Sequence, residues 1–297
     1  SRLADINLSI RDIVASDIAT QSPALSWLSV VEARMTADLS MSLDAKGNLG
    51  PLFADLNIEK GEVRANSQAQ PLAFDGASVA LSYDPNKAEI DFAQLDIQSP
   101  IGGFSGRGHA MLDQDATGWP RSITSQMDFD GVTVGPESLY EVPLDLGTVS
   151  VQSRLTLSPF KLELGEVQVG QGDNAIRARA IAEAVPNGWD LGIDIAAEAL
   201  DRDRVLEIWP VSYLPLTRVW VLDNLAQSDL RGLNASLRFH PETLPQIAAN
   251  WQFSNTEVTF MKGLPPLQDG AGFATLQDNT LTFAIEKGRI AAPQGGL

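Results

Sequence analysis

The chain has 297 residues, of which 44% are hydrophobic and 7% aromatic, and its 21 Lys and Arg against 38 Asp and Glu give a net charge of −17. This is enough apolar material for a sizeable core. The absence of cysteine excludes disulfides, thiolate zinc sites and a cysteine nucleophile. An acidic chain without clustered cations is also a poor partner for nucleic acid. With two histidines in all, the composition favours a protein that is not an enzyme and needs no metal or cofactor.

The two ends and the missing cysteines bear on where the protein works. The sequence starts at Ser1 and stops at Leu297 after two glycines, so we interpret it as a segment of a longer protein. It contains no apolar run of the roughly 18 residues that span a membrane, and no signal peptide. Freedom from cysteine suits the bacterial cell envelope, where thiols are easily oxidised. We therefore expect any anchor or export signal to lie outside this sequence.

The first predicted element is a short helix over residues 24–31, because Ser22 and Pro23 suit the N-cap and the first turn. The sequence then alternates with a period of two: apolar residues take every second position, and Ser, Thr, Asp or Gln fill most of the others. The clearest alternating segments are 35–43, 79–83, 93–97, 149–157, 191–195, 251–253 and 281–285. Since strand side chains point alternately to two faces, each segment predicts a strand with one apolar and one polar face.

The strands are expected to form an antiparallel sheet. Parallel sheets are covered on both faces and show continuous apolar runs instead of alternation. Turn signals such as Asp84-Pro85-Asn86-Lys87 and Pro186-Asn187-Gly188 separate the segments, and their spacing predicts roughly fifteen strands. We treat residues 1–297 as one elongated unit with rough sub-units 1–141, 142–231 and 232–297.

A second helical zone is predicted over residues 201–226, interrupted by Pro210 and Pro215. Its acidic start at Asp201 and Asp203 suits a helix N-terminus. An apolar stripe follows, formed by Leu216, Val219, Trp220 and Leu222.

Two interpretations of this helical zone stay open. The favoured one packs the helix on the apolar face of the sheet, with Trp209, Trp220 and Trp251 gathered there and their indole N–H groups bonded. In the other, the helix plugs or gates the interior of the sheet.

A sheet of this size must bury its apolar face. It can do so as a two-sheet sandwich, as a closed barrel, or as a curled sheet whose interior takes up something else. A strand of about seven residues spans about 24 Å, so a curled sheet could shelter an acyl chain, at about 0.8 kcal/mol per buried CH₂. From the residues alone, the sandwich stays ahead of a lipid-holding sheet.

The segment after residue 200 resembles a known pattern. Ile208-Trp209-Pro210, Leu214-Pro215 and the run from Arg218 to Leu225 are similar to the helical segment of the AsmA-like superfamily, in its YhdP-type members. Gly263-Leu264-Pro265-Pro266-Leu267, followed by Gly270-Ala271-Gly272, resembles the turn and strand that come later in that family. The resemblance is specific over residues 200–296 and looser before them, where Gly47-Asn48-Leu49 and Lys60-Gly61-Glu62-Val63 match expected turns.

The resemblance implies a fold and a function. Members look like elongated β-grooves, bridge-like lipid transfer proteins that are anchored in the bacterial inner membrane and extend through the periplasm. They are thought to carry phospholipid toward the outer membrane. This chain would then be one segment of such a groove, with its membrane contacts in regions outside it.

Three other motifs point to ordinary structure. The glycine-rich residues 102–108 lack the helix that a phosphate-binding loop requires, and predict a bulge or tight turn. Residues 113–118 begin like a calcium loop but lack its later ligands. His109 and His240 could each join a carboxylate, but no nucleophile is placed to complete a triad.

We therefore predict an all-β protein: an elongated, twisted, curled antiparallel sheet with one or two short helices packed against it. Its expected function is to bind or transfer phospholipid in the periplasm, with no reaction, cofactor or metal. The residues predicted to line the apolar groove are Leu39, Met41, Leu81, Leu95, Ile97, Val151, Leu155, Ile193, Phe253 and Phe283. The alternative is a structural or assembly module that pairs with envelope proteins at its sheet edges. A hydrolase built on His109 or His240 comes third.

Overall fold

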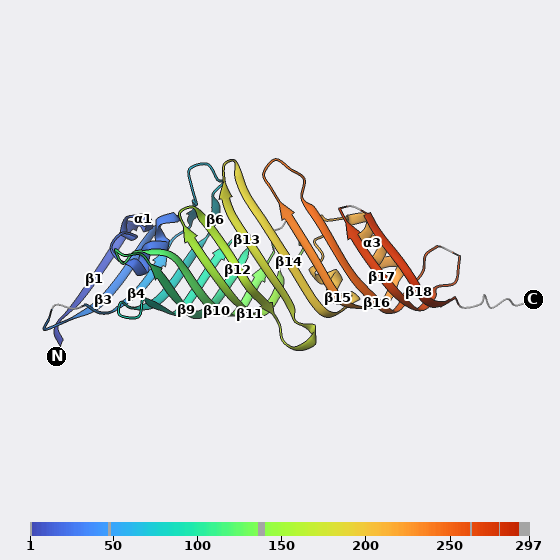
Figure 1. The fold of residues 1–297 in the computed structure, drawn as a ribbon, viewed down its shortest axis with the longest axis horizontal. Helices are drawn as coiled ribbons and strands as arrows, with labels where there is room; N and C mark the ends of the chain where they lie inside the picture. The colour runs from blue at the N-terminus through green and yellow to red at the C-terminus, as the bar shows by residue number, and fades with distance from the viewer. Residues whose placement is uncertain (1, 47–48, 136–139, 262, 279, 291–297) are drawn as a thin grey trace, which may run out of the picture.

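The structure is a computed structural model that describes residues 2–46, 49–135, 140–261, 263–278 and 280–290. Within them, fifteen strands form one antiparallel sheet, in which every strand pairs with its neighbours in chain order (Figure 1). The strands are β1 (Arg2–Val14), β3 (Arg34–Asp44), β4 (Leu49–Ile58), β7 (Gly76–Asp84), β8 (Glu89–Ser99), β9 (Gly102–Gln114), β10 (Pro120–Val134), β11 (Leu144–Leu157), β12 (Phe160–Val169), β13 (Ile176–Val185), β14 (Gly188–Asp201), β15 (Leu225–Phe239), β16 (Gln246–Val258), β17 (Leu267–Gln277) and β18 (Thr280–Ile290).

The sheet is open, because β1 and β18 each pair on one side only within the described residues. The predicted fold class, a curled antiparallel sheet with few helices, is confirmed.

Insertions interrupt the succession of strands. A helical segment with a short strand precedes β3, two short strands precede β7, and two helices precede β15. These elements are α1 (Ala15–Ile18), the 3₁₀ helix η1 (Pro23–Val30), β2 (Val31–Glu32), β5 (Gly61–Val63), β6 (Leu72–Phe74), the 3₁₀ helix η2 (Gly172–Asn174), α2 (Arg202–Ile208) and α3 (Pro215–Asn224). The strands β2, β5 and β6 form a separate small sheet. In an antiparallel order, these insertions all fall on one long edge, the insertion edge, and most of the short turns fall on the other, the turn edge.

Local signals place the helices where the sequence predicted them. The Ser22 hydroxyl accepts a hydrogen bond from the Ala24 N–H at 3.3 Å, and Pro23 begins η1. The Asp201 carboxylate accepts one from the Arg204 N–H at 2.7 Å at the start of α2. Pro215 occupies the first turn of α3. The predicted helical segments are therefore present, the first of them as a 3₁₀ helix.

The strand register collects the apolar positions on one face of the large sheet. In the N-terminal half, Leu39 lies opposite Ala54, which lies opposite Leu81. In the C-terminal half, Ala180 lies opposite Ile193, which lies opposite Leu237. Following the register from strand to strand carries this apolar face from β1 to β18.

A β-bulge in β8 changes the predicted alternation. Leu81 pairs with Phe92 while Ala80 pairs with Gln94, so Ala93 has no partner opposite it and its side chain is exposed. Placing Ala93 on the apolar face with Leu95 and Ile97 was therefore wrong. The extra residue shifts the alternation by one position, and Phe92 takes the inward place.

The sheet coils so strongly that its two edges meet. The loop between β5 and β6, on the insertion edge, contacts the β13–β14 hairpin on the turn edge, although β7 to β12 separate β4 from β13. The Trp189 indole N–H donates to the Gln70 carbonyl at 2.8 Å, and the Asn66 amide to the Ala184 carbonyl at 3.4 Å. Twist accumulates from strand to strand in one direction, which brings segments from opposite edges together.

Candidate functional site

The apolar face of the sheet is the candidate site, and its ten predicted residues all lie on it. The register assigns each of them to this face, across the bulges in the strands that lie between. They are Leu39, Met41, Leu81, Leu95, Ile97, Val151, Leu155, Ile193, Phe253 and Phe283. The structure then divides them into two groups, according to what covers them.

The N-terminal part of the face is covered by the chain's own helical segment. Leu25 and Leu28 of η1 are 1% and 0% exposed, and they join a core that includes Met35 of β3 and Leu56 of β4. The cluster extends along the sheet to Ile123 of β10. We call it the N-terminal core.

Five of the predicted residues belong to the N-terminal core. Leu81 is buried within it, and Leu39, Met41, Leu95 and Leu155 pack against it. Protein side chains therefore cover Leu81, whereas the other four stay partly exposed beside the cluster.

The C-terminal part of the face has much less cover. Val151 of β11 and Ile193 of β14 are half-buried and belong to neither core cluster of the described residues. The same holds for Ile97, although it lies in the N-terminal strand β8. Phe253 is buried, and its ring meets that of Phe283 edge-on at 6.2 Å, yet Phe283 stays 51% exposed. We call the apolar side of β11–β18, apart from Leu155, the open apolar face.

Small side chains line the middle of the open apolar face. Ala178, Ala180, Ala182 and Ala184 occupy four successive inward positions of β13, flanked by the larger side chains of β12 and β14. We call these four the alanine floor. They were not among the predicted residues, although the alternation of alanine with Arg177, Arg179, Ile181 and Glu183 in the sequence is the signal that would have found them.

The open apolar face presents no charge. At its paired positions, the described residues carry no charged side chain. Its hydroxyl groups bond to one another: Ser153 with Ser125 of β10 at 2.6 Å, and the buried pair Ser228 and Thr256 at 2.9 Å. Since paired hydroxyls need no further hydrogen-bond partner, this part of the face suits an apolar ligand.

Two contacts bridge the face near the alanine floor. Trp189 lies at the end of β14, where its ring meets that of Phe160 edge-on at 5.6 Å. Its N–H holds the β5–β6 loop through Gln70. Together with the Asn66 bond to Ala184, this loop links the N-terminal region to the end of the floor.

The α2–α3 hairpin bridges the face a second time. The Tyr213 hydroxyl, between the helices, donates to the Asp278 carbonyl at 3.2 Å on the turn edge. At the insertion edge, the Thr259 N–H donates to the Asn224 carbonyl at the end of α3, at 2.9 Å. Val205 and Ile208 of α2 pack on Leu200 and Leu230 of the sheet.

Two arginines connect the helices of the α2–α3 hairpin by hydrogen bonds. Arg202 of α2 donates to the Leu222 carbonyl at 3.1 Å, and Arg218 of α3 donates to the Leu206 carbonyl at 3.3 Å. Both acceptors lie in the last turn of a helix that has no basic residue of its own there. Each helix thus supplies the cation that favours the C-terminus of the other.

The favoured interpretation holds for α2, whose Val205 and Ile208 pack on the apolar face of the sheet, but it was wrong for the α3 stripe. Leu216, Val219, Trp220 and Leu222 are between 37% and 85% exposed, whereas Val221 is buried. The helix α3 turns Arg218 and Val221 inward, because the hydrogen bond from Arg218 to the Leu206 carbonyl requires Arg218 to lie between the two helices. Trp209 does find a partner, the Tyr213 carbonyl at 2.7 Å.

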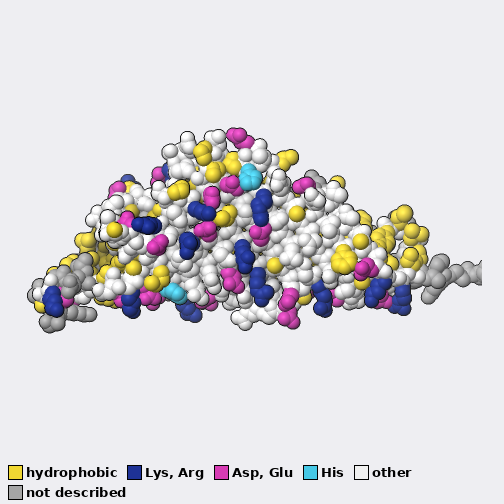
Figure 2. Space-filling view, viewed as in Figure 1, with side chains coloured by type: hydrophobic (Ala, Val, Ile, Leu, Met, Phe, Trp, Pro, Cys, Tyr) yellow, Lys and Arg dark blue, Asp and Glu magenta, His cyan; other side chains and the backbone are white. Residues whose placement is uncertain are grey.

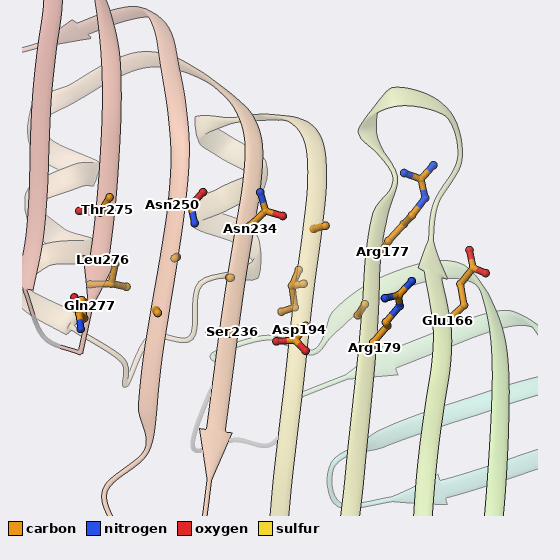
Figure 3. Close-up of a pocket in the computed structure, with 16 residues that line it drawn as sticks. Glu166, Arg177, Arg179, Asp194, Asn234, Ser236, Asn250, Thr275, Leu276 and Gln277 are labelled. Carbon is orange, nitrogen blue, oxygen red and sulfur yellow. The ribbon is translucent and has the colours of Figure 1, made fainter.

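The opposite face of the sheet is polar and carries a shallow hollow of about 700 Å³ over β12–β17. Arg177, Arg179, Glu166 and Asp194 stand along one side of it, and Asn234, Ser236 and Asn250 along the other (Figure 3). Acidic and basic side chains are interspersed over the face seen in Figure 2. Lys161 lies on this face between Glu163 and Glu183, and hydrogen bonds to both raise its pKa.

The titratable groups and the remaining motifs do not converge on one place. His240 contacts Asp190 at 3.0 Å on the polar face, and His109 lies in β9. Asp115 accepts bonds from the Thr117 N–H and hydroxyl, which lower its pKa and close the β9–β10 turn. In the part of the chain that the structure describes, no group of His, Asp and Glu could hold a metal.

The glycine-rich segment lies mainly inside β9, where the sequence predicted a bulge or tight turn. At Gly106 and Gly108 a Cβ would meet the backbone of β10 at 2.4 and 2.2 Å. Of the predicted turn residues, Gly47 and Asn48 lie outside the described residues.

Comparisons with known proteins do not identify the chain. No protein-family model matches it, and neither the curated proteins nor the solved structures include a match. None of the helices in the described ranges is long and apolar enough to cross a membrane. What the fold and the site define is a class: an open, coiled antiparallel sheet with one apolar face that is only partly covered.

Proposed function

We propose that the chain binds the acyl chains of phospholipid on its open apolar face, as a non-enzymatic segment of a lipid-transfer protein. One observation carries the proposal. Eight neighbouring strands share an apolar, uncharged face, and helices cover it only at the cluster around Leu200 and Leu230, in contrast to the N-terminal core. Burying one acyl chain of about fifteen methylenes there would gain on the order of 12 kcal/mol before the costs of ordering.

The alanine floor gives the ligand its place. Four small side chains in a row on β13 leave room between the larger residues of β12 and β14. The hydroxyls on the face already bond to one another and need no hydrogen bond from a ligand. The face therefore selects the acyl chain and not the headgroup. The periplasm of a bacterium, with an anchor supplied by other parts of the protein, remains the proposed setting.

The test places a large side chain on the alanine floor. The variant Ala180→Phe places a ring over β13, while Ala196→Phe places the same ring on the polar face of the adjoining strand β14. We expect Ala180→Phe to weaken binding of a fluorescent fatty acid about tenfold, because about two methylenes lose their place. Ala196→Phe should bind as the parent chain does. Equal binding by both variants, or no binding by the parent, would refute the proposal.

The second candidate is an assembly module that pairs through its sheet edges. It is favoured by β18, an eleven-residue strand whose outer side has no partner among the described residues and whose Phe283, Ile285 and Ile290 are exposed. Free strand edges invite pairing with another chain. Crosslinks from β18 to a protein, together with an apolar face that takes up no fatty acid, would favour this candidate.

A further inference from the structure

We propose that the outward face of α3 and the β16–β17 loop form a docking surface for a phospholipid bilayer. The surface, called the α3 patch, consists of Leu216, Val219, Trp220, Phe260, Met261 and Leu264. It goes beyond the proposed acyl-chain site, because these side chains point away from the sheet or stand on a loop at its edge.

The exposure of α3 is the reverse of what a surface helix normally shows. Leu216, Val219 and Trp220 follow a spacing of three and four residues, so they share one side of the helix. This side is exposed, at 85%, 53% and 37%, while the side that carries Arg218 and Val221 faces the protein. An apolar helix side turned to solvent marks an interaction surface.

The β16–β17 loop extends the same surface. The Thr259 N–H bonds to the Asn224 carbonyl, so the loop leaves the sheet directly beside the end of α3. Phe260, Met261 and Leu264 follow at once and are 49%, 64% and 57% exposed. Figure 2 shows hydrophobic side chains gathered at this end of the molecule, beyond the last strands.

Charge identifies a bilayer as the occupant. The chain carries −17, yet residues 208–224 and 258–268 contain a single acidic residue, Asp223 at the end of α3, so little repulsion opposes the approach of these segments to lipid phosphates. The patch is a helix surface with a neighbouring loop, and its Trp, Phe, Leu and Met are residues that enter the boundary between headgroups and acyl chains. The acidic remainder of the chain should keep the molecule from binding strongly anionic membranes.

Vesicle flotation with the whole 297-residue chain tests the proposal. The probe is phosphatidylcholine vesicles, and the variant is Leu216→Asp, which suits the first turn of a helix and should leave α3 folded. The matched control is Leu244→Asp, a leucine 87% exposed in the β15–β16 turn. We expect Leu216→Asp to lower the bound fraction about tenfold at limiting lipid, with Leu244→Asp unchanged.

Lipid charge and self-association supply the remaining outcomes. Binding should persist in high salt and weaken as phosphatidylglycerol is added. Failure to float, equal loss in both variants, or binding that needs anionic lipid and disappears in salt would overturn the proposal. Self-association without lipid that Leu216→Asp abolishes would overturn it in favour of a second copy. Fatty-acid binding in solution should be the same in Leu216→Asp as in the parent, which separates this proposal from the proposed function.

Discussion

The N-terminal and C-terminal parts of the sheet share one register and one apolar face, but they bury that face differently. In the N-terminal part, η1 lays Leu25 and Leu28 on β3 and β4 and completes a core of the ordinary kind. In the C-terminal part, the α2–α3 hairpin covers only the cluster around Leu200 and Leu230. The alternation of apolar and polar residues thus locates the apolar face of the sheet. The insertions between the strands determine whether the protein's own side chains cover that face.

Mutations in the two parts of the sheet should differ in how far they lower the free energy of unfolding. Leu28→Ala removes a fully buried side chain from the N-terminal core and should lower the free energy of unfolding by about 3 kcal/mol. Ile193→Ala removes a half-buried side chain from the open apolar face and should cost about 1 kcal/mol. Urea denaturation of the two variants measures the difference. Equal costs would mean that the C-terminal face is covered as well as the N-terminal one.

The bond between the β5–β6 loop and the β13–β14 hairpin joins the two parts. Trp189→Phe keeps a ring against Phe160 but removes the N–H that Gln70 accepts. We expect a loss of about 1 kcal/mol, and faster amide hydrogen exchange in residues 64–71. Trp119→Phe, in the exposed β9–β10 turn, is the control. Unchanged exchange in the loop would show that this bond does not hold the two parts together.

The smallest effect should come from alkaline pH at Lys161 in the C-terminal part. Its bonds to Glu183 and Glu163 raise its pKa in the folded state. The stabilisation is therefore complete below the pKa of an unfolded lysine and is lost as pH rises through the higher folded pKa. The free energy of unfolding, measured by urea denaturation, should therefore fall more over that range in the parent chain than in Lys161→Met. An equal fall in both chains would mean that another group is responsible.

The sequence could predict the sheet because alternation is a local signal. Residues 35–43 and 149–157 became β3 and β11, and Ser22 and Pro23 located η1. It could not predict the bulge at Ala93, which depends on the strands on either side. The strands β5 and β6 have three residues each, too few for a pattern.

The candidate site was predictable in part. Alternation placed all ten predicted residues on one face, but it holds no information about which of them η1 would cover. The direction of the α3 stripe was also out of reach, because it follows from the bonds that Arg202 and Arg218 make between two helices. Such contacts join residues that are distant in sequence, and no local pattern encodes them.

Photo-crosslinking from two positions of the same face tests the central claim most directly. A photoreactive residue replaces Leu81, in the N-terminal core, or Ile193, on the open apolar face beside the alanine floor. With phospholipid present, the account predicts lipid adducts from Ile193 and only crosslinks within the chain from Leu81. Lipid adducts from both positions, or from neither, would contradict it.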